Sequence, residues 1–164
     1  MFVLRPLRAG DDLSAFECGS DALTTWLTST AHRAHDQGVV RVYVWVDESK
    51  PARVLGYSAI QPTQALAADL TRGQSGGHST VPGYLIARLA LDTTLHGQGL
   101  GSELLVRSLE VCVRAAGVGG GRIIVVDPID DAARDFYLRH DFLPTKGDHR
   151  LAMKVATARS ALGG

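Results

Sequence analysis

A glycine-rich run, His96-Gly97-Gln98-Gly99-Leu100-Gly101, offers the clearest chemistry in this sequence. A strand-like apolar segment from Tyr84 to Asp92 precedes the run. A helical apolar stripe follows it, formed by Leu104, Leu105, Leu109, Val111 and Cys112. A strand, a glycine loop and a helix start together form an anion site, because glycines let backbone N–H groups turn inward and the helix N-terminus carries partial positive charge. The run therefore predicts a site for a phosphorylated ligand; a plain strand-to-helix turn is the simpler alternative.

Two nucleotide-binding patterns fail on this loop. The dinucleotide fingerprint requires a glycine where Ser102 stands and an acidic residue about 20 residues further on, where this chain has glycines. The P-loop requires a lysine, which the loop lacks. The run instead resembles the pyrophosphate loop of the GNAT N-acetyltransferases, Gln/Arg-x-x-Gly-x-Gly/Ala, at Gly99 and Gly101, and departs from that pattern at His96.

This resemblance implies acetyl-CoA as cosubstrate and no metal. In the GNAT fold the strand before the loop and the strand after the following helix splay apart and hold the pantetheine arm. Here these strands are Leu89-Ala90-Leu91 and Ile124-Val125-Val126. The cofactor-binding residues that the resemblance implies are Leu89, Ala90, Leu91, His96, Gly97, Gln98, Gly99, Leu100, Gly101 and Ser102. Core packing is the simpler role for the three strand side chains.

A second motif, from Ala132 to Phe142, resembles the GNAT segment A-x-x-F-Y-x-x-x-G-F, with Asp141 in the place of the glycine. We expect Asp141 to strain the turn there. The resemblance implies that Tyr137 is the general acid that protonates the departing CoA thiolate. A phenol with a pKa near ~10 can protonate a thiolate whose thiol has a pKa near ~8.5, although not downhill. The alternative is that Tyr137 packs beside Phe136 with its hydroxyl at the surface.

No general base is evident from the sequence. Asp92 and Asp127 follow strands, Glu103 and Glu110 lie on a helix, and none forms an evident pair with another ionisable group. An α-amino group with a pKa of about 7.7–8.0 is already partly neutral at pH 7 and needs little help. We interpret Asp92 as a loop cap.

Alternating elements surround these motifs. We expect strands at 2–7, 39–46, 54–60, 84–91 and 122–127, and two closing strands at 142–143 and 150–155. Helices are expected at 13–16, at about 20–37, from the glycine loop to about 116, and from Asp130 or Asp131 to about 140. Residues 61–82 lack periodicity and predict a mobile loop. The prediction is an α/β fold of the GNAT type: one domain over residues 1–156, a central mixed sheet of six to seven strands with about four flanking helices, and a disordered tail over 157–164.

Composition limits the class of protein. The chain has 164 residues, is 45% hydrophobic and carries no formal net charge, so no global basic field draws it to nucleic acid or membrane. The two cysteines form no CxxC pair, and Cys112 lies on the apolar stripe. We see neither a signal peptide nor a membrane span, and expect a cytoplasmic protein without membrane contact.

Further segments resemble a GNAT toxin subfamily of type II toxin–antitoxin systems. They include Phe16-Glu-Cys-Gly19, Leu23-Thr-Thr-Trp-Leu27 and Ala87-Arg-Leu-Ala-Leu-Asp92. Those toxins acetylate the α-amino group of aminoacyl-tRNA, are commonly dimers, and pair with ribbon-helix-helix antitoxins. Binding tRNA requires cations on one surface. The candidates are Arg33, Arg41, Arg88, Arg134 and Arg139, although scattered arginines are ordinarily solvated.

Three functions are therefore compatible with the sequence. The first is an aminoacyl-tRNA N-acetyltransferase toxin that is a homodimer and has an antitoxin partner. The second is a small-molecule or peptide N-acetyltransferase. The third is an acetyl-CoA-binding module without catalysis, which the departures at His96 and Asp141 favour.

Overall fold

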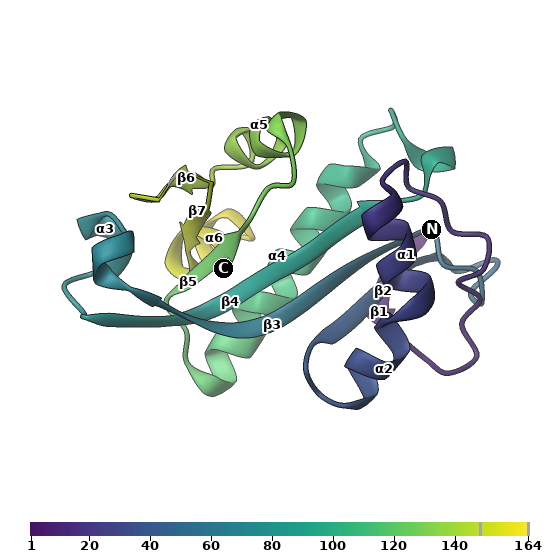
Figure 1. Cartoon of the computed structure of the whole chain (residues 1–164), viewed down its shortest axis with the longest axis horizontal. Helices are drawn as coiled ribbons and strands as arrows, with labels where there is room; N and C mark the ends of the chain where they lie inside the picture. Colours follow the sequence, from purple (N-terminus) through teal and green to yellow (C-terminus); the bar gives the residue numbers. More distant parts are fainter. Residues whose placement is uncertain (148, 164) are drawn as a thin grey trace. The chain divides into compact units, whose positions relative to one another are not determined.

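The computed structural model describes residues 1–147 and 149–163 (Figure 1). Within them seven strands form one mixed sheet in the order β1-β2-β3-β4-β5-β7-β6. The strands are β1 (Phe2–Pro6), β2 (Arg41–Asp47), β3 (Gly56–Leu66), β4 (Thr80–Leu91), β5 (Ile123–Val126), β6 (Leu143–Pro144) and β7 (Leu151–Lys154). The α-helices are α1 (Asp21–Ser29), α2 (Ala31–Asp36), α3 (Arg72–Ser75), α4 (Leu100–Gly119), α5 (Asp131–Arg139) and α6 (Val155–Ala161). The α/β class with a mixed sheet of six to seven strands is confirmed, with more short helices than the four expected.

The chain divides into two compact units, of which the first comprises residues 1–61 and 88–108. Here β1, β2 and the start of β3 pair antiparallel, with Val44 opposite both Arg5 and Tyr57. Side chains of β2 alternate between two apolar clusters, as a strand with both faces covered requires. Val42, Val44 and Val46 pack with residues of α1 and α2, whereas Trp45 packs with Leu91 of β4 and Leu104 of α4.

The second unit comprises residues 62–87 and 109–164. In it β4 pairs parallel with β5, and β7 pairs antiparallel with both β5 and β6. The four residues of β5 are all buried, which explains their continuous apolar run. Gly83 of β4 is required by close approach, because a Cβ there would collide with the carbonyl oxygen of Ile123.

The single helix expected over about 20–37 is wrong, since the structure has two helices that meet at Thr30. Thr30 leaves helical geometry (φ −124°). Just before it, the Thr28 hydroxyl donates to the carbonyl of Thr24 and the Ser29 hydroxyl to that of Thr25. Such hydroxyl bonds to the preceding turn bend helices and compete with the backbone ladder. The helix expected at 13–16 is also absent from the described chain, and just before it Asp12 forms an isolated β-bridge with Arg53.

The mobile loop predicted over 61–82 is wrong as well. β3 continues to Leu66, β4 begins at Thr80, and α3 lies between them with a complete capping box of Thr71 and Gln74. β3 contains Pro62 and β4 contains Pro82. Because proline is rare in the interior of a strand, sequence rules do not predict strands over these residues.

The disordered tail predicted over 157–164 is wrong through Ala161, because α6 occupies Val155–Ala161 with Val155 and Ala158 buried. Gly164 lies outside the described residues. Both cysteines are free and buried, in agreement with a packing role. In the part of the chain that the structure describes, no helix is long and apolar enough to cross a membrane, and no cluster of metal-ligating side chains occurs.

Candidate cofactor and acceptor site

The glycine loop connects the end of β4 to the start of α4, as predicted. After Leu91, Asp92 begins the short 3-10 helix η2 (Thr93–Leu95), the loop follows, and α4 starts at Leu100. Gly97 (φ 77°) and Gly99 (φ 75°) adopt left-handed backbone conformations, and open space surrounds both positions. Backbone conformation rather than lack of room therefore requires glycine at both sites.

The loop is anchored at both ends, while Gly97 and Gly99 remain exposed. Leu95 and Leu100 pack against the cluster of Trp45, Leu91 and Leu104. The His96 ring nitrogen Nε2 lies 2.7 Å from the carbonyl oxygen of Leu91. A carbonyl only accepts, so Nε2 carries the proton. His96, which departs from the family pattern, thus uses its ring to tie the loop to the strand.

Asp92 is a cap, as the sequence indicated. The residue is 2% exposed, and its carboxylate accepts hydrogen bonds from the N–H and hydroxyl of Thr94 and from the N–H of Glu17. Burial alone raises the pKa of Asp92, but these hydrogen bonds outweigh burial and hold the pKa below its usual value. The carboxylate is committed to the backbone and is not poised as a base.

All ten predicted cofactor residues lie between Leu89 and Ser102, within the first unit. Leu89 and Leu91 pack into the cluster that contains α4, whereas Ala90 packs on the opposite face with α1 and α2. At the other end, the first N–H groups of α4 have no acceptor within the helix and carry partial positive charge. Leu100, Gly101 and the half-buried Ser102 form this first turn. In this arrangement the N-terminus of α4 can bind a pyrophosphate, and the backbone of β4 before the loop can pair with the amides of a ligand.

Tyr137 lies in the last turn of α5, in the second unit, and is 8% exposed. The helix ends in a Schellman motif, since the N–H of Phe142 donates to the carbonyl of Tyr137 and the N–H of Asp141 to that of Leu138. Asp141 has φ 70°, the left-handed value expected at the position where the family has glycine. The Tyr137 ring contacts Phe142 and Phe136 edge-on, with centroids 5.4 Å apart in both pairs.

The Tyr137 hydroxyl is a protonated donor with no fixed acceptor. Burial raises its pKa above the usual value near 10, so the phenol is neutral at physiological pH. It forms no hydrogen bond with any residue of the described ranges. Tyr137 therefore packs beside Phe136, as the alternative interpretation held, but its side chain is buried and not placed with the hydroxyl at the surface.

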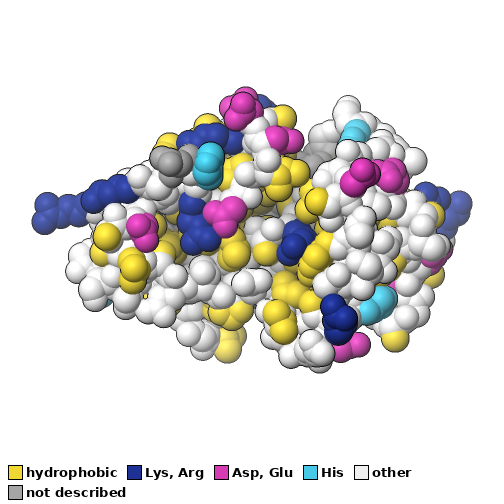
Figure 2. Space-filling view, in the orientation of Figure 1, with side chains coloured by type: hydrophobic (Ala, Val, Ile, Leu, Met, Phe, Trp, Pro, Cys, Tyr) yellow, Lys and Arg dark blue, Asp and Glu magenta, His cyan; other side chains and the backbone are white. Residues whose placement is uncertain are grey.

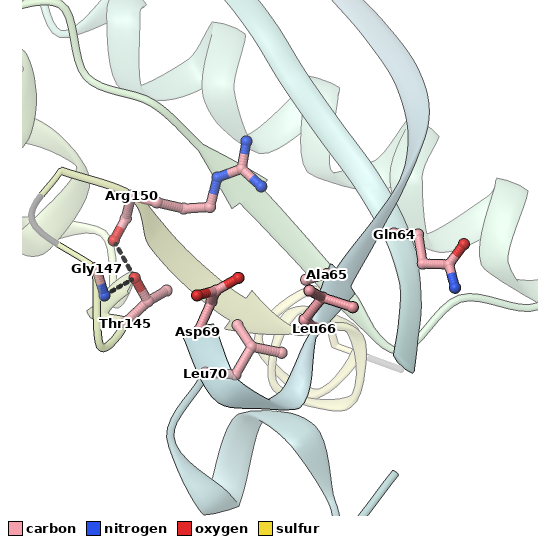
Figure 3. Close-up of a pocket in the computed structure, with 8 residues that line it drawn as sticks. All are labelled: Gln64, Ala65, Leu66, Asp69, Leu70, Thr145, Gly147 and Arg150. Carbon is pink, nitrogen blue, oxygen red and sulfur yellow. Dashed lines mark hydrogen bonds between the residues drawn. The ribbon is translucent and has the colours of Figure 1, made fainter. Parts of the chain in front are cut away.

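The second unit also contains a polar pair and a pocket that sequence reasoning missed. Arg150 binds Asp127 through two hydrogen bonds of 2.9 and 2.8 Å. A pocket of about 430 Å³ lies beside Arg150 (Figure 3). Its lining is Gln64, Ala65, Leu66, Asp69, Leu70, Thr145, Gly147 and Arg150. Figure 3 shows the Thr145 hydroxyl bridging the carbonyl of Arg150 and the N–H of Gly147, which fixes this wall. Apolar side chains beside a few polar groups are typical of small-molecule sites.

The five candidate arginines are in different environments. Arg33 and Arg41 are exposed on α2 and β2, with Arg41 next to His35. Arg88 is half-buried on β4, and its guanidinium carbon lies 4.3 Å from the centroid of the Trp26 ring. The other two belong to the second unit, where Arg134 donates to the carbonyl of His149 and Arg139 is exposed. Acidic and basic side chains are interspersed on the face seen in Figure 2, so any contact with a polyanion depends on such individual arginines.

The structure is a mixed α/β sheet protein in which β4 leads through a glycine loop into the long helix α4, an arrangement that suits a phosphorylated cofactor. Residues 11–142 match the acetyltransferase (GNAT) family model, and the chain belongs to this family of acetyltransferases.

One relative and two solved structures are similar over nearly the whole chain. A tRNA-acetylating toxin of Mycobacterium tuberculosis is 35% identical over 162 residues, which are 97% of this chain and 95% of that protein. The structure of AtaT complexed with acetyl-methionyl-tRNAfMet is 25% identical with a TM-score of 0.90, covering 98% of this chain and 99% of that one. The structure of AtaTR bound with AcCoA is 26% identical with a TM-score of 0.84, covering 98% and 97%.

Proposed function

We propose that this chain transfers the acetyl group of acetyl-CoA to the α-amino group of aminoacyl-tRNA and thereby blocks translation. The observation that carries this proposal is the 35% identity, along 97% of the chain, to a tRNA-acetylating toxin. The similarity to AtaT complexed with acetyl-methionyl-tRNAfMet supports the same acceptor.

The glycine loop and the end of β4 supply the cofactor site in this proposal. The N–H groups of 97–101 and Ser102 bind the pyrophosphate of acetyl-CoA, aided by the positive end of α4. The backbone of Leu89 and Leu91 pairs with the pantetheine amides in the manner of an added strand. Within the unit that contains them, these groups lie on one run of chain held by the apolar anchors Leu95 and Leu100. The amine then attacks the thioester carbon directly, and the C–S bond breaks.

Tyr137 is the proposed general acid. The breaking C–S bond leaves a thiolate, whose thiol has a pKa near ~8.5, and the neutral Tyr137 hydroxyl donates its hydrogen to that sulfur. Because burial raises the pKa of the phenol further above that of the thiol, full transfer of the proton stays uphill even to the full thiolate, and the hydroxyl acts first as a hydrogen-bond donor to the charge that develops on sulfur. The amine loses a proton as the amide forms, which restores the proton balance. No carboxylate base is required, in keeping with the structural use of Asp92.

The proposal includes contacts of Arg33, Arg41, Arg88, Arg134 and Arg139 with the tRNA backbone. It also includes a homodimer in the cytoplasm and a ribbon-helix-helix antitoxin that covers the toxin. Support for an antitoxin comes from the similar AtaTR structure and from the fold shared with a toxin bound to the C-terminus of the antitoxin AtaR.

A translation assay tests the proposed activity. We expect the purified chain to stop cell-free protein synthesis only when acetyl-CoA is present, and fresh aminoacyl-tRNA to restore synthesis once acetyl-CoA has been removed. Inhibition that is independent of acetyl-CoA would contradict the proposal.

The pocket shown in Figure 3 favours a second candidate, an acetyltransferase that acts on a small amine or peptide. Its volume of about 430 Å³ lies within the range of small-molecule sites, and the carboxylate of Asp69 suits an ammonium group. Acetylation of free amines at rates above those for aminoacyl-tRNA would favour this candidate.

A further inference from the structure

Arg88 is a half-buried cation whose hydrogen-bond donors are unused. Its guanidinium lies over the Trp26 ring at 4.3 Å, and it forms no hydrogen bond or ion pair within residues 1–147 and 149–163. Other arginines with partly buried side chains use their donors for hydrogen bonds within the chain. Arg5 and Arg150 each bind a carboxylate with two nitrogens, and Arg122 donates to the carbonyls of Gln74 and Gly73.

An aromatic stack fixes the orientation of Arg88. The Trp26 ring is nearly parallel to the Tyr57 ring (12°, centroids 5.9 Å apart), and the Tyr57 hydroxyl donates to the carbonyl of Leu23 at 2.7 Å. Phe16 packs edge-on against Tyr57. Tyr57 is fully buried, so Trp26 rests on a rigid base. Trp is the aromatic residue that attracts a cation most strongly. The stack therefore holds a guanidinium in place while leaving its N–H groups to bind a ligand.

The position of Arg88 on β4 separates it from the pyrophosphate loop. Successive side chains of a strand point to opposite faces, so Arg88 shares a face with Ala90, which packs with α1 and α2. Leu89 and Leu91 point to the other face, where they join the cluster that anchors the glycine loop. An anion bound to Arg88 therefore lies on the face of β4 opposite the cluster that anchors the glycine loop, which makes the acceptor a better source of that anion than the cofactor pyrophosphate.

We propose that Arg88, positioned by Trp26, binds the phosphate of the 3′-terminal nucleotide of the acceptor tRNA. This inference rests on the proposed function. In aminoacyl-tRNA the amino acid is esterified to the ribose of that nucleotide, so its phosphate is the first anion along the chain from the reacting amine. A planar guanidinium matches a phosphate with two parallel hydrogen bonds, which fixes orientation as well as affinity. Arg88 binds substrate directly and Trp26 is a positioning residue.

The salt dependence of tRNA binding tests this inference. We would measure the Kd of uncharged and aminoacylated tRNA over a salt series for the unmodified chain, Arg88→Gln, Arg88→Lys and the control Arg159→Gln, an exposed arginine of α6. Loss of one phosphate contact on a single strand lowers the slope of log K against log salt by about 0.7. We expect that change and about tenfold weaker binding at low salt for Arg88→Gln. Arg88→Lys should keep the slope and lose part of the affinity, and the control should change neither.

Trp26→Leu tests the positioning role. We expect weaker tRNA binding for Trp26→Leu alone and no further loss when it is added to Arg88→Gln, because both variants remove the same contact. The Kd of acetyl-CoA should be unchanged in all variants, which verifies the fold. An unchanged slope for Arg88→Gln, with or without weaker binding, would overturn the phosphate contact. A chain that neither binds nor acetylates tRNA would overturn the proposed function with it, whereas acetylation with an unchanged slope would overturn this inference alone.

Discussion

Replacing Asp141 by glycine is expected to stabilise the protein. Asp141 follows the C-cap of α5 with φ 70°, and is the one non-glycine residue with positive φ among those that the structure describes. The two hydrogen bonds of the Schellman motif, from the N–H groups of Asp141 and Phe142, require this conformation. The family has glycine at this place, so this chain carries a strained residue two positions before the start of β6.

The magnitude follows from three contributions: backbone conformation, backbone entropy and charge. The left-handed conformation costs an ordinary L-residue roughly 1–2 kcal/mol, and aspartate lies at the low end because its side chain tolerates it. Glycine removes this cost but loses about 0.5–1 kcal/mol of backbone entropy on folding. The carboxylate also faces the negative end of the α5 dipole, which costs about 0.3–1 kcal/mol. The net gain for Asp141→Gly is therefore about 1 kcal/mol, or roughly 2–4 °C in Tm for a chain of this size.

Thermal and urea unfolding of Asp141→Gly and Asp141→Asn separate the contribution of charge from those of the backbone. Asparagine removes the charge and tolerates positive φ, so we expect about half of the gain seen with glycine. Acetyl transfer should be unchanged in both variants, because the motif that holds Tyr137 is kept. A glycine variant less stable than the unmodified chain would refute the reasoning, and equal gains for the two variants would assign the whole effect to charge.

Three further predictions concern the loop, the acid and pH. Gly99→Val should weaken acetyl-CoA binding at least tenfold in calorimetry, because valine strongly disfavours the left-handed backbone of the loop, whereas Gly117→Ala within α4 should bind normally. Tyr137→Phe should lower kcat on the order of 10²-fold and leave the Kd of acetyl-CoA unchanged, and equal kcat values would remove Tyr137 from the mechanism. Burial lowers the pKa of His35, and the positive charge of Arg41 lowers it further. The Nδ1 atom of His35 accepts a hydrogen bond from the N–H of Val42. As the pH falls, His35 is therefore protonated in the unfolded chain before it is protonated in the folded chain. Its contribution to the free energy of unfolding is fully present above about pH 6.5 and is lost as the pH falls below that value. His35→Gln should flatten this dependence in urea unfolding between pH 7.5 and 5.5, and an equally steep loss would contradict it.

Local features of the site could be predicted from the sequence because their causes lie within a few residues. The glycine loop, its place between a strand and a helix, the cap at Asp92 and the strained Asp141 all depend on backbone conformation and near neighbours. The same holds for β5, whose four apolar residues lie between two polar segments.

Features that depend on distant contacts could not be predicted. Arg88 and Trp26 are 62 positions apart, and only the paired strands and α1 bring the guanidinium over the ring. Likewise Asp127 and Arg150 meet through the β5–β7 pairing, and no local pattern indicates that pair. Two wrong predictions, the single helix over 20–37 and the loop over 61–82, have local causes. These causes are the hydroxyl bonds before Thr30 and the prolines inside β3 and β4, and intrinsic propensities are too weak to indicate either outcome.

The most direct test of the central claim is transfer of labelled acetyl from acetyl-CoA to pooled aminoacyl-tRNA, with uncharged tRNA and free amino acids as controls. We predict label on charged tRNA alone, released together with the acetylated amino acid when the ester is hydrolysed in mild base. Label on free amino acids, or none on charged tRNA while acetyl-CoA still binds, would contradict the account and direct attention to a small-molecule acceptor.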